Sequence, residues 1–179
     1  QSKQIDMKNE IHFIMTGGTI DSYYEGIKDT VVPSKHSIIP RYVGSLKLAT
    51  KFSFTEVCMK DSRSLTKTDL VNLLKTVEKS PSQKILITHG TYTMGDTARF
   101  LKANLKRKDQ IIILTGSFIP LDGFNFSDGP FNIGFAVAQF QQLQPGVYIS
   151  MNGKVLTAEE VMKVISCGTF DSIFGERTK

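Results

Sequence analysis

Short apolar runs alternate with segments of helical periodicity along most of this chain, and this alternation constrains the fold more than any other feature. The runs expected to form buried strands span residues 11–15, 52–60, 84–88, 110–114 and 147–151. Strands that alternate with helices favour a parallel sheet with right-handed crossovers. We therefore predict an α/β fold, a doubly wound open sheet that is mostly parallel, with helices on both faces.

The segments between the runs indicate where helices begin and end. Thr66 and Asp69 are spaced like a capping box, and Leu70, Leu73, Leu74 and Val77 then recur at helical spacing before Pro81. Further helices are predicted over residues 95–107, 130–142 and 158–165. A short helix is expected after Ser34, limited to its first turn or split by Pro40. Residues 17–35 form a long polar connection, which we interpret as a lid.

Length and composition bound the class of protein. The 179 residues fit a single domain, 1–179, in which 1–10 is expected to be an extended leader or remnant and 166–179 is a weakly patterned tail. The net charge of +5 is diffuse, so we expect no nucleic-acid partner. Two cysteines and three histidines without ligand spacing indicate neither a disulfide scaffold nor a metal site. With no apolar run of membrane-span length and no signal-peptide pattern, we expect a cytoplasmic protein without membrane contact.

Two threonine-rich turns follow predicted strands directly. The first strand is followed by Thr16-Gly17-Gly18-Thr19, which we expect to form an exposed turn at the end of the strand. The third strand ends with Thr88-His89-Gly90-Thr91. The carboxyl ends of parallel strands lie at the edge where open α/β sheets bind ligands. Each turn taken alone could be a structural βα connection as well as part of a binding site. His89 taken alone could be a hydrogen-bonded structural residue. Together, hydroxyl groups without a metal cluster favour hydroxyl-nucleophile chemistry or polar-ligand binding.

Six segments in order resemble the L-asparaginase family of the threonine-nucleophile type. They are IMTGGTID (14–21), MKDSR (59–63), ITHGTYTM (87–94), LTGSFIP (114–120), SDGPFN (127–132) and MNG (151–153). The likeness runs from about residue 11 to 163, and the chain resembles both the short, single-domain branch of the family and the N-terminal domain of its longer members. It implies hydrolysis of the side-chain amide of asparagine to aspartate and ammonia through an acyl-threonine intermediate. It also implies a small-molecule substrate, no cofactor and a homo-oligomer.

The resemblance assigns roles residue by residue. Thr16 matches the nucleophile, and Tyr24, with Tyr23 as the alternative, matches the loop tyrosine that helps to activate it. Thr91 matches the second threonine and Lys163 the lysine that partners it, although Lys163 alone could also be a solvated helix lysine. Ser62 matches the residue that holds the substrate's α-carboxylate. The same segments place further residues beside the substrate, namely Gly17, Asp61, Arg63, Gly90 and Tyr92.

The sequence departs from the family pattern at Tyr92, where the family has aspartate. In the family that carboxylate pairs with the catalytic lysine and receives the substrate's α-ammonium group. Losing a charged hydrogen bond costs about 1.5–3 kcal/mol. Three readings therefore stay open: an asparaginase, which could also act on glutamine, a catalytically impaired ligand-binding protein, and a hydrolase of another small amide.

Overall fold

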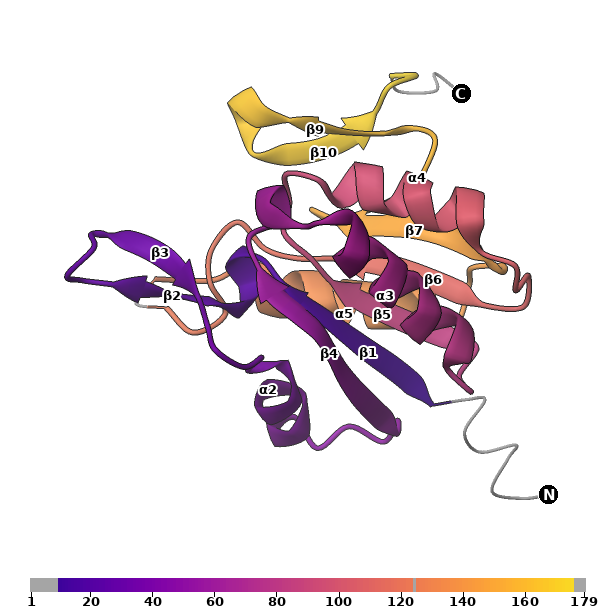
Figure 1. The fold of residues 1–179 in the computed structure, drawn as a ribbon, viewed down its shortest axis with the longest axis horizontal. Helices are drawn as coiled ribbons and strands as arrows, with labels where there is room; N and C mark the ends of the chain where they lie inside the picture. Colours follow the sequence, from indigo (N-terminus) through magenta and orange to yellow (C-terminus); the bar gives the residue numbers. More distant parts are fainter. Residues whose placement is uncertain (1–9, 124, 176–179) are drawn as a thin grey trace.

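A six-stranded sheet forms the centre of the molecule (Figure 1). The computed structural model describes residues 10–123 and 125–175. The strand order is β4-β1-β5-β6-β7-β8, in which the first five strands are parallel and β8 is antiparallel to β7. The strands span Ile11–Gly17 (β1), Phe52–Lys60 (β4), Lys84–Thr88 (β5), Ile111–Thr115 (β6), Gly146–Met151 (β7) and Lys154–Thr157 (β8).

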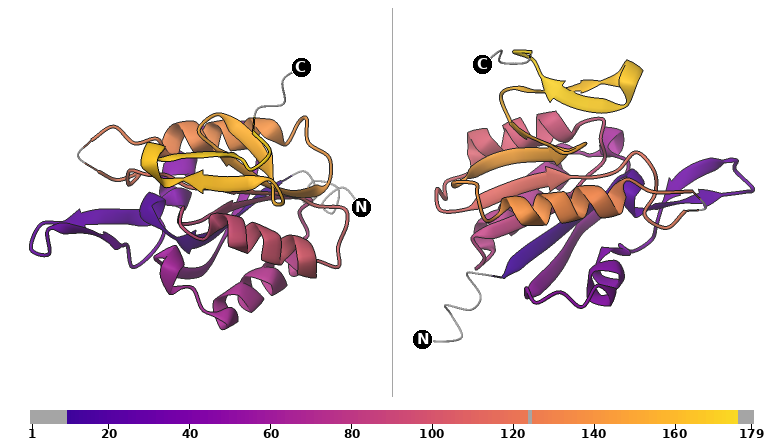
Figure 2. Two further views of the ribbon diagram at one scale, coloured as in Figure 1. Left: turned by 90° about the horizontal axis from the view of Figure 1, so that it is seen from above. Right: turned by 180° about the vertical axis from the view of Figure 1, so that it is seen from behind.

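Helices cover both faces of the sheet, as the sequence predicted. Helices α3 (Lys67–Lys79) and α4 (Met94–Asn104) pack on one face, where Leu73 and Leu101 join a core with Ile85. Helices α2 (Ile39–Ser45) and α5 (Gly129–Gln139) pack on the other, where Ile39 and Ile133 are buried. Figure 2 shows α5 in front of the sheet from the side opposite to that of Figure 1. The predicted α/β fold is confirmed.

Helix α3 begins at the capping box that the sequence indicated. The Thr66 hydroxyl accepts from the Asp69 N–H at 3.2 Å, and the Asp69 carboxylate accepts from the Thr66 N–H at 2.8 Å. Such a cap stabilises a helix by about 1 kcal/mol. Lys60 also donates to Asp69 at 2.8 Å, which ties the end of β4 to the start of the helix.

The long connection over residues 17–35 contains a β-hairpin. Strands β2 (Ser22–Glu25) and β3 (Thr30–Pro33) follow a 3-10 turn, Thr19–Asp21, and project away from the body of the molecule (Figure 1). The short helix expected after Ser34 is α2, which begins at Ile39. Pro40 therefore opens this helix instead of splitting it, because an N–H is not needed in the first turn.

The helix predicted over residues 158–165 is wrong. Residues Val161–Val164 form strand β9, which pairs in an antiparallel hairpin with β10 (Thr169–Ser172). A 3-10 turn, Ile165–Cys167, and a left-handed Gly168 connect the two strands. The β-branched valines suit a strand, and the buried Phe170 fixes the hairpin on the core. The described part of the predicted tail is thus ordered, whereas residues 1–9 and 176–179 lie outside the described residues.

Candidate active site

The strand order defines a crevice at the carboxyl ends of β1 and β5. From β1 the chain crosses to β4 on one side, then returns to β5 on the other side of β1 and continues outward to β6 and β7. Connections that leave in opposite directions open a crevice at this point, where open α/β sheets bind ligands. Thr16 lies near the end of β1, and Gly90 and Thr91 follow β5 directly.

Glycines allow three connections to meet in this crevice. Gly18 has a φ of 83°, and a Cβ there would lie 2.4 Å from Cα of Gly90. A Cβ on Gly90 would in turn lie 2.7 Å from the hydroxyl oxygen of Ser62. Only glycine permits such close backbone approach. The ends of β1, β4 and β5 are therefore in direct contact.

Thr16 is more enclosed than the sequence suggested. It lies inside β1 and is 2% exposed, so the expectation of an exposed strand-end turn is wrong. Its hydroxyl donates to the carbonyl oxygen of Thr88 at 2.9 Å. The pairing of β1 with β4 changes register between Met15 and Gly17. Irregularities of this kind redirect a strand beside a functional site.

Lys163 and Thr91 form a hydrogen-bonded pair. The Lys163 Nζ donates to the Thr91 Oγ1 at 2.8 Å, although the two residues are 72 positions apart in sequence. Lys163 comes from β9, so the alternative of a solvated helix lysine is wrong. Burial lowers the pKa of Lys163, and the positive charge of Arg63 adds to this effect, while Asp61 opposes it. A lysine with a lowered pKa is suited to proton transfer.

Tyr92 lies beside this pair and contacts two cations. The Lys163 Nζ is 3.7 Å from the centre of the Tyr92 ring, and the Arg63 guanidinium carbon is 4.5 Å from it. Arg63 also donates two side-chain hydrogen bonds to Asp61, at 2.8 and 3.0 Å. The Asp61 carboxylate is thus held by Arg63, which lowers its pKa, and it caps the turn that begins at Ser62.

Tyr24 is not part of these contacts. It lies on β2, and its hydroxyl donates to Asp29 of the same hairpin. That hairpin projects away from the sheet (Figure 1). The hydroxyl of the alternative residue, Tyr23, donates to Glu25 at 3.4 Å, also within the hairpin. The remaining predicted residues lie at or beside the ends of β1, β4 and β5 or on β9.

Three residues that support the crevice were not singled out from the sequence. The Thr93 hydroxyl donates to the Ser62 carbonyl at 2.9 Å and so fixes the Ser62 turn. Asp128 accepts from the N–H groups of Phe118 and Ile119 at 3.0 Å, and the Phe118 ring lies 5.3 Å from Lys163. Thr93, Phe118 and Asp128 all fall in matched motifs, so those motifs contained the signal.

His89 is a neutral structural residue. It is fully buried, which lowers its pKa to about 4. Its Nδ1 lies 2.7 Å from the Gly90 carbonyl oxygen and its Nε2 lies 2.9 Å from the Thr97 hydroxyl oxygen. A carbonyl oxygen can only accept, so Nδ1 carries the proton and Nε2 accepts from Thr97. The ring thereby orients the Gly90 turn.

We expect His89 to make the fold sensitive to acid. Its pKa is about 4 in the folded chain and 6.5 in the unfolded chain, so the unfolded chain binds more protons between these values. As the pH drops from neutral to below about 4, protonation of His89 should therefore lower the free energy of unfolding by up to about 3 kcal/mol. Urea titrations of the wild type and His89→Gln across this range measure the difference. An equal acid sensitivity of both proteins would contradict the assignment.

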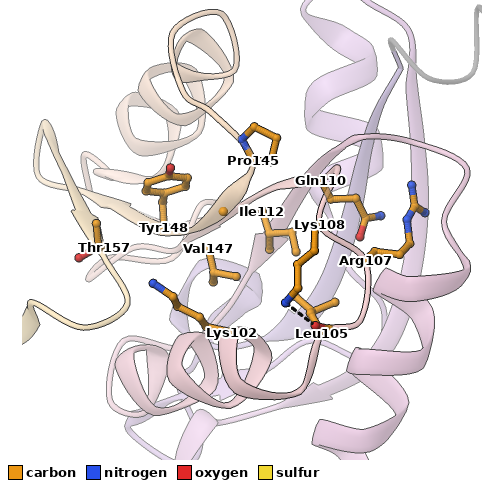
Figure 3. Close-up of a pocket in the computed structure, with 11 residues that line it drawn as sticks. Lys102, Leu105, Arg107, Lys108, Gln110, Ile112, Pro145, Val147, Tyr148 and Thr157 are labelled. Atoms are coloured by element: carbon orange, nitrogen blue, oxygen red, sulfur yellow. Dashed lines mark hydrogen bonds between the residues drawn. The ribbon is translucent and has the colours of Figure 1, made fainter.

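A separate cavity of about 280 Å³ lies at the opposite, amino edge of β6 and β7 (Figure 3). Its three cations already have partners: Lys102 pairs with Glu159, Arg107 with Asp109, and Lys108 donates to the Leu105 carbonyl. None of the predicted site residues lines this cavity. We therefore place the candidate site at the carboxyl edge.

Within residues 10–123 and 125–175, no group of three or more histidine, cysteine, aspartate or glutamate residues is arranged to hold a metal ion. Across the same residues, no helix is long and apolar enough to cross a membrane.

Comparison with known proteins decides the family. A family profile described as "Asparaginase, N-terminal" matches residues 10–175. The chain belongs to the asparaginase family. A glutaminase-asparaginase of Acinetobacter glutaminasificans is 32% identical over 178 residues, covering 90% of this chain and 52% of the relative. An L-asparaginase of Thermococcus kodakarensis is 35% identical over 91 residues, covering 50% of this chain and 27% of the relative.

Solved asparaginase structures share the fold. The thermostable L-asparaginase from Thermococcus kodakarensis superposes with a TM-score of 0.79 at 28% identity, covering 92% of this chain and 51% of that one. A probable cytoplasmic L-asparaginase from Campylobacter jejuni gives a TM-score of 0.77 at 26% identity, and the match covers 92% of this chain and 53% of that one. This asparaginase-family chain thus spans about half the length of these solved relatives.

Proposed function

We propose that this chain hydrolyses a small carboxamide, the side-chain amide of asparagine or of a compound with the same carbon skeleton, to a carboxylate and ammonia. The observation that carries the proposal is the Lys163–Thr91 hydrogen bond of 2.8 Å beside the crevice at the ends of β1 and β5. A hydroxyl paired with a lysine of lowered pKa can move protons near neutral pH. Family membership supports amide hydrolysis as the reaction.

In the proposed mechanism the Thr16 hydroxyl oxygen attacks the carboxamide carbon. Rotation of the hydroxyl away from the Thr88 carbonyl frees it for this step. Backbone N–H groups of the glycine turns stabilise the oxyanion. The Thr91–Lys163 pair accepts the proton of the nucleophile and returns it to the leaving nitrogen, so ammonia departs and an acyl ester on Thr16 remains. Water then hydrolyses the ester.

The competing function is a ligand-binding protein that has lost turnover through Tyr92. The retained Lys163–Thr91 pair favours the enzyme, because binding alone requires no lysine of lowered pKa beside a hydroxyl. An ammonia-release assay with asparagine, glutamine and amides that lack an α-amino group tests the proposal. We expect ammonia from at least one of them. Binding without ammonia release would favour the competing function.

We further propose that the chain forms a homo-oligomer, as the family resemblance implies. An exposed aromatic side chain on α5 supports this: Phe131 is 60% exposed and stacks on the half-buried Phe135 with ring centres 6.0 Å apart. Sedimentation equilibrium tests the oligomeric state.

We also propose a cytoplasmic location, which is supported by the Campylobacter neighbour described as probably cytoplasmic. A relative from Haemophilus influenzae is described as a probable periplasmic L-asparaginase, so cell fractionation is the appropriate test.

A further inference from the structure

Tyr92 lies in a corner of the crevice beside two positive charges. Lys163 and Arg63 both lie over its ring, at 3.7 and 4.5 Å from the ring centre. Aromatic faces attract cations within about 6 Å. The ring is 53% exposed, so it borders solvent in the open crevice. Its π-face is already occupied by two cations of the protein.

The carboxylates near this corner are also occupied. Both oxygens of Asp61 accept from Arg63, and one of them also accepts from the Arg63 backbone N–H. Asp96, in the first turn of α4, pairs with Arg99 at 2.9 Å. Asp128 accepts from two backbone N–H groups and from Asn132. Each of these three described carboxylates thus already has a cationic or N–H partner.

The formal charge of the corner is positive while Lys163 carries its proton. Arg63 and Lys163 then contribute two positive charges and Asp61 one negative charge, which leaves one net positive charge beside the buried Ser62 hydroxyl. After Lys163 loses its proton, Arg63 and Asp61 balance, so the corner carries no net negative charge in either state. A carboxylate entering the crevice is attracted by the positive charge and by the Ser62 hydroxyl. An ammonium group entering beside it is repelled by this charge, and Asp61, the carboxylate of the corner, is already neutralised by its ion pair with Arg63.

We propose that Tyr92 makes this crevice select the monoamide of a dicarboxylic acid, a carboxylate with a terminal carboxamide and no α-ammonium group, over asparagine. Succinamate, which is asparagine without its α-amino group, represents this class. The inference rests on the proposed function, because it assigns the substrate class of the same hydrolytic crevice. Tyr92 acts here as a specificity-determining residue through its position over Lys163.

The turnover test compares kcat/KM for succinamate and for asparagine in three proteins. The wild type is expected to favour succinamate by tenfold or more. Tyr92→Phe is the matched control: it keeps the ring and should keep the same ratio. Tyr92→Asp places a free carboxylate beside Lys163 and should reverse the preference. A wild type that favours asparagine, or a Tyr92→Asp variant with the wild-type ratio, would overturn the inference.

A binding test separates this inference from the proposed function. Succinate and L-aspartate differ by the same α-ammonium group and require no turnover to bind. Calorimetry of the wild type should show tighter binding of succinate by tenfold or more, with the order reversed in Tyr92→Asp. Equal or tighter binding of L-aspartate, or no binding of succinate, would overturn the inference. If succinate binds selectively and neither amide releases ammonia, the proposed function fails while the selectivity stands.

Discussion

Thr16→Ala is expected to reduce kcat/KM for carboxamide hydrolysis by about 10⁴-fold or more, because it removes the proposed nucleophile. The substitution also removes the hydrogen bond to the Thr88 carbonyl, which should cost about 1 kcal/mol of the free energy of unfolding. The fold should therefore remain intact. Steady-state ammonia release measures the activity, and a urea titration measures the stability.

Thr16→Ser is the matched control for this variant. It retains a hydroxyl that can donate to Thr88, so it should keep more turnover than Thr16→Ala. If Thr16→Ala releases ammonia at the wild-type rate while Thr91→Ala does not, the nucleophile is Thr91.

Lys163→Met is expected to lower kcat/KM by about 10²–10⁴-fold, the range for loss of a positioned proton-transfer group. Methionine keeps most of the apolar stem on β9 and removes the group that donates to Thr91. The wild-type activity should rise with pH as the ammonium of Lys163 loses its proton. Because burial lowers the pKa of this lysine, the rise should occur below its usual value of 10.5, and it should be absent in the variant.

Lys154→Met provides the control for Lys163→Met. Lys154 is a lysine on β8 that pairs with Asp171 on β10 at 2.9 Å. Its substitution removes an ion pair to the β9–β10 hairpin but leaves the Lys163–Thr91 hydrogen bond in place. The activity should therefore stay close to that of the wild type. A Lys154→Met variant as impaired as Lys163→Met would show that hairpin packing, rather than proton transfer, explains both losses.

The centre of the sheet could be predicted from the sequence because its inner strands, such as β1 and β5, are buried on both faces. Residues 85–87 of β5 are all apolar, and the Thr66–Asp69 cap indicated the start of α3. The β9 strand was missed since Val161 and Val164, three residues apart, also fit one face of a helix. Its strand conformation depends on pairing with β10 and on burial of Phe170, both of which are tertiary contacts.

The candidate site shows the same division between local and tertiary information. The positions of Ser62 and Thr91 after strands, and of Thr16 near the carboxyl end of β1, followed from local pattern. The family resemblance indicated the pairing of Thr91 with Lys163. The contacts of Tyr92 could not be predicted, because Arg63 and Lys163 reach its ring from separate segments of the chain. Likewise, the pairing of Tyr24 with Asp29 depends on the geometry of the β2–β3 hairpin.

The proposed mechanism requires that an acyl group forms on Thr16 during turnover. Acid quenching during turnover of a hydrolysed amide, followed by trypsin digestion and mass spectrometry, tests it directly, because cleavage at Lys28 and Lys84 places Thr16 and Thr91 on different peptides. We expect an acyl adduct whose fragments locate it on Thr16. An adduct on Thr91, or steady ammonia release without any adduct, would contradict it.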